Sequence, residues 1–580
     1  MKHSKMALIL AVIVLSSVAA SDGPRLHFVT TARQFGPVGY RDPAGAMSPD
    51  GVWLAYSVGR MLRAQRIDGG PVHEVGAINS QVRYIAWLPD SRHVAVQDRE
   101  PDTGAPSWQV FEVLTGKKER LWPNNPEAAR LSHLAWSPDG GSVAGVLRQG
   151  DGSQLWRMDA SGKQITVTES TARLSYPVWT PHGAKIACLV SGNGSQRVSL
   201  DCEADPNGSG SWDQEGYGRF ALSADGKSIY LAAPNEHGML DVWSRGLADG
   251  TMARLSAFSR DAYEITAAAD GRVLFKTQIY DPRIAVVPAN GGPTKELATF
   301  LAETPSWDWT GTKVGFTYGN WRRVIDDFHY PDIAQHVGVI SVADATATEP
   351  EHTVQSSTSE DQGMCWSPNG KWIAFHSHFG PSDDLWIEPA DGSQASRQIT
   401  RDGHETGWPR WSPDGKWLIY PSHVNDRPKA RMYLVGMDQE TGTVTRPQQE
   451  VPLEGFTQHA MQTEWMPDSE TLVFESGGPP GKKAIYTVSR TGGRPKLVHQ
   501  WDSEQHYSGI GLSPDGKWVA FVGPSSNGYF QIFRVPATGG TPEQITFDPT
   551  DKTQPSYSPD GDRIVFTVFS YESQFWLLSP

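Results

Sequence analysis

The chain has 580 residues, including 22 tryptophans, 58 glycines and 42 prolines, and its formal net charge is −14. This acidic balance and the lack of a basic tract in the sequence argue against nucleic acid as a partner. Many glycines, prolines and aromatic residues favour short strands joined by tight turns, and therefore an all-β protein.

Residues 1–20 are predicted to be a cleaved signal peptide. Lys2 and Lys5 form a basic start, and 6–18 is an apolar run too short to span a membrane as a mature helix. Val18-Ala19-Ala20 fits the small-residue rule for cleavage, and no cysteine follows it as a lipid anchor would require. We therefore expect a periplasmic or secreted protein without a transmembrane segment in its mature chain.

From there to the end of the chain, one short phrase recurs about twelve times. It ends a strand with an aromatic or apolar residue and continues with Ser-Pro-Asp-Gly, in which proline presets φ, aspartate bonds its own backbone and glycine accepts positive φ. Successive copies lie 40 to 59 residues apart, which is the length of one four-stranded propeller blade. The clearest copies are Trp136-Ser-Pro-Asp-Gly140, Trp366-Ser-Pro-Asn-Gly370, Trp411-Ser-Pro-Asp-Gly415, Leu512-Ser-Pro-Asp-Gly516 and Tyr557-Ser-Pro-Asp-Gly561.

These units resemble the PD40 (WD40-like) repeats of TolB-like propellers and of the non-catalytic propeller in prolyl-oligopeptidase-like proteins. The resemblance implies an all-β fold of tandem β-propellers with about twelve four-stranded blades. Because twelve blades exceed the usual four to eight, we expect two six-bladed propellers, at 21–300 and 301–580. A seven-plus-five division is the alternative. The last blade lacks an outer strand after Leu578, and we expect residues 25–30 to supply it.

One position differs between the two halves of the repeat array. The residue nine places before each turn aspartate should begin the inner strand, so equivalent residues would converge on the mouth of a central channel. In the first half, three arginines at this position predict a funnel for carboxylates or uronates. The first-half residues are Arg41, Gln81, Arg130, Arg173, Gly216 and Asp261.

In the second half, the same position carries two histidines and three carboxylates. This set predicts a divalent-metal site for Ca, Mn or Zn, or an acid/base cluster, with His404 and Gln458 beside it. The alternative is that these are ordinary exposed polar residues of a loop. The second-half residues are Leu301, Glu360, Glu405, His459, His506 and Asp551.

Two further segments depart from the repeat. Residues 319–336 are an insertion that either ligates a cation or packs between the propellers through Trp321, Phe328 and Tyr330, and we favour packing. His376 and His378 alternate on a strand, as metal ligands or as hairpin residues. The possible cation ligands of the insertion are Asp326, Asp327, His329, Asp332 and His336.

The three cysteines give two expectations. Cys188 and Cys202 lie in one blade and form either a disulfide or two separate buried thiols. Cys365 sits in a predicted core strand and is expected to be inert.

No hydrolase nucleophile elbow or other recognised catalytic motif occurs in the sequence. We therefore expect a monomeric, non-enzymatic scaffold that binds a protein, peptide or glycan, as the resemblance to TolB-like propellers implies. The alternative is a metal-assisted lyase acting on an acidic oligosaccharide, which the weaker resemblance to oligogalacturonate lyases implies. In that case Glu360, Glu405, His459 and His506 would hold the metal.

Overall fold

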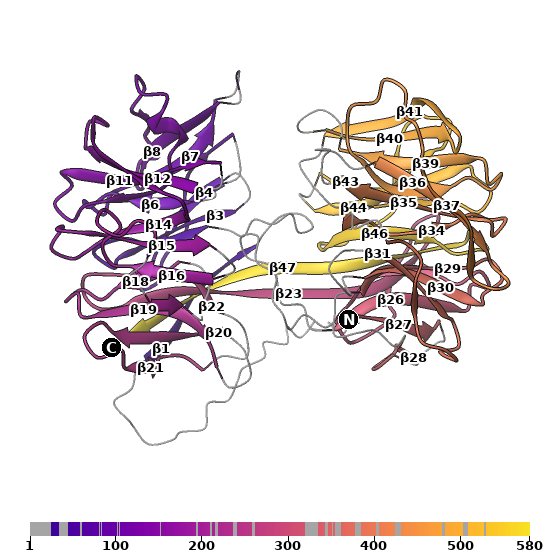
Figure 1. The fold of residues 1–580 in the computed structure, drawn as a ribbon, viewed down its shortest axis with the longest axis horizontal. Coiled ribbons are helices and arrows are strands. Elements are labelled where there is room, and N and C mark those ends of the chain that lie inside the picture. Colours follow the sequence, from indigo (N-terminus) through magenta and orange to yellow (C-terminus); the bar gives the residue numbers. More distant parts are fainter. Residues whose placement is uncertain are drawn as a thin grey trace, which may run out of the picture.

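A computed structural model describes most of the chain after the predicted signal peptide. Figure 1 shows an all-β molecule in which two groups of sheets lie side by side. Among the described residues the only helix is a 3₁₀ turn, η1 (Ala128–Arg130), so none is long and apolar enough to cross a membrane. The described residues are 25–33, 44–58, 61–79, 82, 84–100, 103, 105–150, 152–192, 195–208, 212–214, 219–235, 240–257, 262–319, 335–342, 346–350, 352–353, 361–377, 384–401, 405–423, 431–477, 482–502, 509–526 and 529–579.

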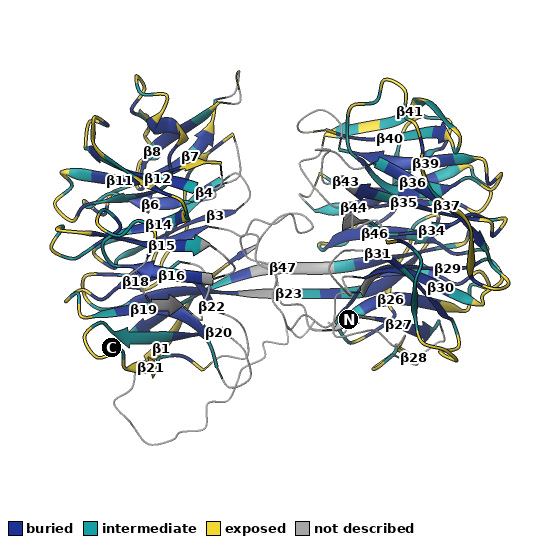
Figure 2. Cartoon of the chain, viewed as in Figure 1, coloured by how far each residue is buried: buried dark blue, intermediate teal, exposed yellow. Residues whose placement is uncertain are grey.

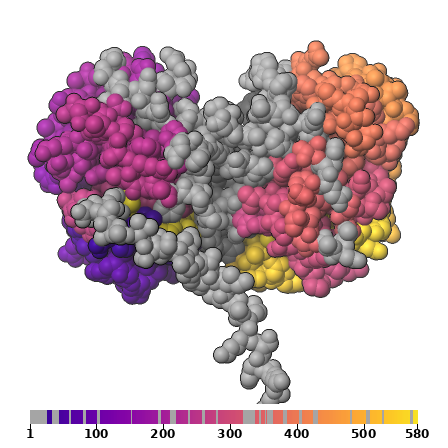
Figure 3. Space-filling view, turned by 90° about the horizontal axis from the view of Figure 1, so that it is seen from below, coloured from indigo at the N-terminus to yellow at the C-terminus, as the bar shows by residue number. Residues whose placement is uncertain are grey.

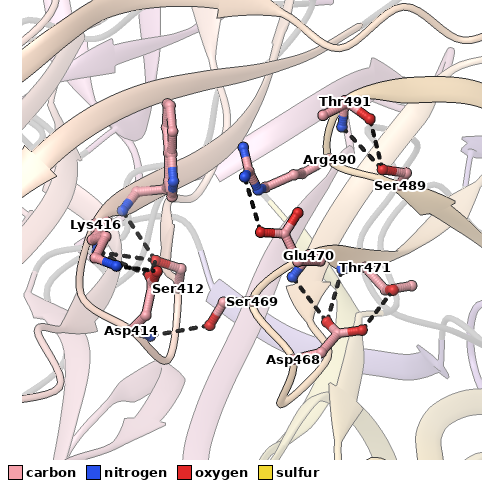
Figure 4. A network of polar contacts seen from close by, with 11 residues as sticks. Ser412, Asp414, Lys416, Asp468, Ser469, Glu470, Thr471, Ser489, Arg490 and Thr491 are labelled. Atoms are coloured by element: carbon pink, nitrogen blue, oxygen red, sulfur yellow. Dashed lines mark hydrogen bonds and ion pairs between the residues drawn. The ribbon is translucent and has the colours of Figure 1, made fainter.

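The Ser-Pro-Asp-Gly turn closes by side-chain hydrogen bonds to its own backbone. Ser412 Oγ donates to Asp414 Oδ1 at 2.6 Å and accepts from the amide of Trp417 at 3.0 Å (Figure 4). Gly415 adopts a φ of 71°, which a side chain would disfavour. Asp414 Oδ1 also accepts from the amide of Lys416 at 3.1 Å, so the predicted roles of aspartate and glycine are confirmed at this turn. The same serine–aspartate bond closes the turns at residues 48–50, 137–139, 223–225, 513–515 and 558–560.

The N-terminal group contains five antiparallel four-stranded sheets, each formed by consecutive strands. They are β2 (Gly45–Met47), β3 (Trp53–Val58), β4 (Met61–Arg66) and β5 (His73–Ala77); β6 (Ile85–Trp87), β7 (His93–Arg99), β8 (Pro106–Glu112) and β9 (Lys118–Leu121); β10 (Ser132–Trp136), β11 (Ser142–Gln149), β12 (Gly152–Asp159) and β13 (Gln164–Ser170); β14 (Arg173–Trp179), β15 (Ile186–Gly192), β16 (Ser195–Ser199) and β17 (Trp212–Gln214); and β18 (Ala221–Leu222), β19 (Ser228–Pro234), β20 (Leu240–Gly246) and β21 (Met252–Arg254).

The C-terminal group also contains five sheets of consecutive strands, one of them with its first strand broken in two. They are β25 (Ala302–Trp307), β26 (Lys313–Gly319), β27 (Gln335–Ser341) and β28 (His352–Thr353); β29 (Asp361–Trp366), β30 (Trp372–Ser377), β31 (Asp384–Pro389) and β32 (Arg397–Gln398); β33 (Glu405–Thr406), β34 (Arg410–Trp411), β35 (Trp417–His423), β36 (Arg431–Asp438) and β37 (Thr443–Glu450); β38 (Ala460–Trp465), β39 (Thr471–Ser476), β40 (Lys482–Ser489) and β41 (Gly492–Asp502); and β42 (Ile510–Leu512), β43 (Trp518–Pro524), β44 (Phe530–Pro536) and β45 (Glu543–Gln544).

The remaining strands form one composite sheet that joins the groups. Its centre is a ribbon of two long antiparallel strands, β23 (Val273–Pro288, 16 residues) and β47 (Arg563–Ser579, 17 residues), paired from Val273↔Leu578 to Pro288↔Arg563 (Figures 1 and 2). Figure 3 shows the two groups as two lobes. The flanking strands are β1 (Arg25–Arg33), β22 (Ala262–Ala267), β24 (Lys295–Glu296) and β46 (Asp551–Tyr557).

Each half of the ribbon supplies the two central strands of one more four-stranded unit. In the N-terminal group the order is β22, β23, β47 and β1, and β1 pairs from Arg25↔Ser579 to Arg33↔Glu572. In the C-terminal group the order is β46, β47, β23 and β24. The predicted pairing of residues 25–30 with the last strand is confirmed. The prediction that they supply the outer strand of the last blade is wrong, because β24 takes that position and residues 25–30 complete a unit of the N-terminal group.

Hydrogen bonds between neighbouring sheets connect the last unit of each group to the first. In the N-terminal group, Arg272 Nη2 donates to the carbonyl of Gly51 at 2.9 Å. In the C-terminal group, Trp307 Nε1 donates to the carbonyl of Ser556 at 3.2 Å. Equivalent tryptophans connect consecutive sheets elsewhere, as Trp87 does to Ala46 at 2.8 Å. The predicted all-β fold with four-stranded blades is confirmed, and we propose that each group is a six-bladed propeller.

The buried core is divided among the spaces between adjacent sheets. One cluster joins Ala55 and Leu62 of the first sheet to Val94 and Phe111 of the second. A second cluster joins Phe275 and Leu578 of the ribbon to the sheet before it. Figure 2 shows the same pattern as buried strands inside both groups. Each sheet is therefore held mainly by its two neighbours, as in other repeat architectures.

The course of the ribbon fixes which sides of the two groups face each other. In every unit the Ser-Pro-Asp-Gly turn or its counterpart follows the first, inner strand. We name this side of each group the turn side, and the opposite side, where inner strands begin, the channel side. β23 starts beside the turn at Asp270 and ends beside the turn at Asp560, so it starts and ends on turn sides. It therefore leaves one group through its channel side and enters the other through its channel side. The channel sides face each other (Figure 1).

Candidate functional site

Two of the three predicted funnel arginines lie among the described residues. Arg130 ends η1 and Arg173 begins β14, so both lie on the channel side, and both are exposed. Within the described part of the chain neither side chain has a hydrogen bond or ion pair. Arg41 lies outside the described residues. The funnel stays a prediction, with two exposed arginines on the expected surface.

The predicted metal set is described only in part. Asp551 is 1% exposed, and its Oδ1 accepts a hydrogen bond from the amide of Phe530 at 2.9 Å. His459 is half-buried beside Gln458, whose Oε1 accepts from Ser476 Oγ at 3.3 Å. The side chains of Glu360, His404, Glu405 and His506 lie outside the described residues. Where side chains are described, no three His, Cys, Asp or Glu residues form a group suited to a metal. The metal site stays a prediction.

The other departures from the repeat are mostly outside the described residues. Residues 320–334, with Asp326, Asp327, His329 and Asp332, lie there, as do His378 and the side chain of His336. His376 is buried in β30, at 6% exposure.

The cysteines are free and buried, and Cys188 is hydrogen-bonded to Cys202. Burial raises the pKa of Cys188 well above its ordinary value and that of Cys365 to about 12. Cys188 and Cys365 are therefore protonated, unreactive thiols at neutral pH.

A second position of the repeat, six residues before the turn aspartate, carries an irregularity that the sequence did not reveal. Strand pairing shifts there in several inner strands, for example between Ser132 and Ala135 and between Thr553 and Ser556. The extra residue of this β-bulge takes a left-handed conformation, which is rare and costly for residues other than glycine. The positive-φ residues are His133 (54°), Tyr176 (49°), Glu264 (53°), Thr304 (53°), Gly363 (60°), Gly509 (87°) and Gln554 (56°).

In the N-terminal group these bulges bring aromatic rings together. The ring of His133 lies 3.7 Å from that of Tyr84 and 4.5 Å from that of Tyr176, measured between centroids. Burial, with a smaller contribution from Arg219, lowers the pKa of His133 to about 3, so the imidazole is neutral. Its Nδ1 shares a hydrogen bond with Ser132 Oγ at 3.1 Å, and its Nε2 is shielded and has no partner among the described residues.

In the C-terminal group the bulges surround a small open pocket. Arg410 is the only charged residue among the described residues that line it. The guanidinium donates from Nε to Glu464 Oε1 at 2.8 Å and from Nη1 to the carbonyl of Pro409 at 2.9 Å. Burial raises the pKa of Glu464, and Arg410 opposes that effect. The lining residues are Thr304, Pro305, Gly363, Met364, Trp408, Arg410, Gln462, Ile510, Gln554 and Pro555.

These residues come from every inner strand of the C-terminal group or from the residues beside it, so the pocket is the central channel of that group. The sequence matches the model of the TolB beta propeller domain (PD40) over residues 409–576, which include part of this lining. The predicted resemblance of the repeat units to TolB-like propellers is confirmed over this range.

Known proteins resemble parts of this chain. An uncharacterized protein of Agrobacterium fabrum is 28% identical over an alignment that covers 15% of this chain and 44% of that protein, so the match spans less than half of the relative. A TolB-type structure from Agrobacterium tumefaciens is 19% identical, with a TM-score of 0.36, covering 50% of this chain and 99% of that one. The tricorn protease is 11% identical, with a TM-score of 0.29 (87% and 62% covered). TolB of Acinetobacter baumannii is 12% identical, with a TM-score of 0.28 (80% and 83% covered).

Proposed function

We propose that this protein is a non-enzymatic binding scaffold that holds a protein or peptide segment between its two groups of sheets. The observation that carries the proposal is the ribbon of β23 and β47, which turns the channel side of each group toward the other. Propellers commonly bind ligands over the channel, and two such surfaces facing each other suit an extended ligand that contacts both. We further propose that the protein is exported and acts as a monomer.

Exposed side chains on the channel sides support a protein ligand. Arg130 and Arg173 are exposed on the N-terminal group. Phe547 lies between β45 and β46, on the channel side of the C-terminal group, and is 67% exposed. Arginine and aromatic residues are enriched in protein interfaces, and a phenylalanine this exposed gains free energy when a partner covers it.

No described contact favours the alternative of a metal-assisted lyase. Asp551, one of the five residues of the predicted metal site, is buried and uses a carboxylate oxygen to bind the amide of Phe530. A carboxylate that ligates a metal would instead direct its oxygens to the cation. We therefore propose the scaffold as the function of this chain.

Site-specific photo-crosslinking in the native host tests the scaffold. A photoreactive residue is placed at Arg130, Arg173 or Phe547, and matched controls carry it at Leu114 and Trp309, which are exposed on the turn sides at 61% and 42%. We expect one discrete protein adduct from the three channel-side positions and none from the controls. Adducts of equal yield from both sides, or none from the channel side, would overturn the proposal.

A further inference from the structure

We infer that the channel of the C-terminal group binds a carboxylate of the polypeptide that the scaffold holds, either its C-terminus or an acidic side chain. This inference rests on the proposed function and names the chemistry that one end of the ligand must offer. It follows from which residues line the pocket, what keeps the pocket open, and which hydrogen-bond donors there have no partner.

Two glycines keep the channel open. Gly363 and Gly509 occupy the bulge position at which other blades carry His133, Tyr176 or Glu264. A Cβ atom at Gly363 would lie 2.0 Å from the side chain of Trp408, and one at Gly509 would lie 2.8 Å from Gln462 Oε1. The absence of side chains at both bulges lets Trp408 and Gln462 reach the channel and leaves space between them.

Arg410 presents unused donors to this space. A guanidinium has five N–H groups, and only Nε and Nη1 of Arg410 have partners, Glu464 and the carbonyl of Pro409. No partner of Nη2 is found in the described part of the chain, and the side chain keeps 20% of its surface exposed. Glu464 fixes the guanidinium without occupying all of its donors, so the free edge can bind a second carboxylate.

Gln554 adds a second oriented donor. Its Oε1 accepts from the amide of Thr304 at 2.9 Å and from Thr567 Oγ1 at 2.9 Å. These two bonds determine which end of the side-chain amide is oxygen, and they leave the Nε2 hydrogens for another acceptor. The described residues offer Nε2 no such acceptor, although Gln554 lines the pocket.

The balance of groups in the lining determines the ligand class. Trp408 Nε1 and the amide of Gln462 are further donors without a partner among the described residues, and none of the described lining residues is Asp or Glu. The described part of this wall, with one guanidinium, two amides and an indole N–H, pairs best with a ligand group that only accepts hydrogen bonds. In a polypeptide, backbone carbonyls and carboxylates are such groups, and of these the carboxylate also carries the charge that a guanidinium binds best.

The test is a calorimetric titration of the full-length protein with three short probes. N-acetyl-triglycine carries a terminal carboxylate, N-acetyl-Gly-Glu-Gly-amide carries a side-chain carboxylate, and N-acetyl-triglycine amide carries none. We expect at least one acid probe to bind ten or more times tighter than the amide, and the tighter acid identifies the source of the carboxylate. Equal affinities for all three probes, or no binding of any, would overturn the inference.

Variants connect the preference to the pocket. Arg410→Met combined with Glu464→Leu removes the buried pair together, so that no charge is left unpaired, and Gln462→Leu removes an amide without a described partner. We expect the first to abolish the acid preference and the second to reduce it severalfold, with unchanged circular dichroism. Arg490→Met removes an arginine paired with Glu470 on the turn side and should leave the preference intact. An acid preference that persists in the double variant contradicts the inference.

The two proposals fail separately. Crosslinks at Arg130, Arg173 and Phe547 in a protein without acid preference keep the scaffold and reject the carboxylate pocket. Acid preference without channel-side crosslinks rejects the polypeptide scaffold, and with it the identity of the ligand as a polypeptide.

Discussion

At the scale of single residues, two adjacent lysines in β40 occupy opposite environments. The side chain of Lys483 is 2% exposed and forms an ion pair with Glu475, which is 1% exposed. Glu475 Oε2 also accepts from the amide of Gly509 at 3.1 Å, so the pair connects neighbouring sheets. Lys482 instead pairs with Asp502 at 2.7 Å, with 46% and 85% of the two side chains exposed.

Lys483→Met is expected to destabilise the protein by about 3–5 kcal/mol, because it leaves the carboxylate of Glu475 buried without its cation. The matched control, Lys482→Met, breaks an exposed pair and should cost less than about 1 kcal/mol. Thermal denaturation of both variants measures the difference. Equal melting temperatures would show that the buried pair contributes no more than the exposed one.

His133 gives the folded protein a dependence on pH. Its pKa is about 3 in the folded state against 6.5 for an ordinary histidine. Between these values the unfolded chain binds a proton that the folded chain does not, so stability is greatest above pH 6.5 and falls as the pH is lowered toward 3. The loss at pH 5 is about 2 kcal/mol.

His133→Gln should remove this part of the pH dependence. Gln554 shows that glutamine occupies the same left-handed bulge position, with a φ of 56°. Denaturant titrations at pH 7 and pH 5 are expected to show a smaller difference in unfolding free energy for the variant, by about 2 kcal/mol. An unchanged difference would mean that the His133 pKa is not lowered in the folded state.

At the scale of elements, the ribbon ties the end of the chain to its beginning. Residues 569–579 of β47 pair with β1 and with the first half of β23, which belong to the N-terminal group. Deletion of residues 569–580 is therefore expected to unfold strands of that group, although the deletion lies at the other end of the sequence. Hydrogen exchange should show faster exchange in β22 and β2 and retained protection in β38 and β39.

Removal of Pro580 alone is the control for this deletion, because Ser579 is the last paired residue. It should leave the exchange pattern unchanged. Loss of protection confined to the C-terminal group in the longer deletion would contradict the pairing of β47 with β1.

The sequence predicted the blades, and the structure explains what it did not predict. The turn at Ser412 and Asp414 depends on contacts within a few residues, so the repeat reveals it directly. The bulge at His133 adds one residue to a strand. A prediction that alternates side chains between the two faces of the strand, counted from the turn, therefore assigns the wrong side chains to the channel. Pairing of residues 25–30 with the last strand was predicted from the missing outer strand. The sequence did not predict that β23 and β47 pair with each other across the two groups. Both strands have the ordinary apolar pattern, and they are distant in sequence.

At the scale of the whole molecule, the two groups should stay together after the chain between them is cut. A cut in the exposed turn at Pro293 and Thr294 leaves β23 on the N-terminal fragment and β47 on the C-terminal fragment. The two strands pair along the length of β23 and should hold the fragments together. A protease site inserted between these residues should yield two fragments that co-elute in gel filtration and separate only in denaturant. Separation under native conditions would show that the ribbon does not hold the groups together.

The pairing of β23 with the last strand of the chain also determines when the two groups can close during synthesis. β23 leaves the ribosome early, but its partner β47 occupies residues 563–579, the last part of the chain to be made. At a translation rate of roughly 5–20 residues per second, β23 remains without its partner strand for on the order of tens of seconds. Neither group can close during that interval, and unpaired edges invite aggregation. We therefore expect newly made chains to depend on a chaperone until translation ends.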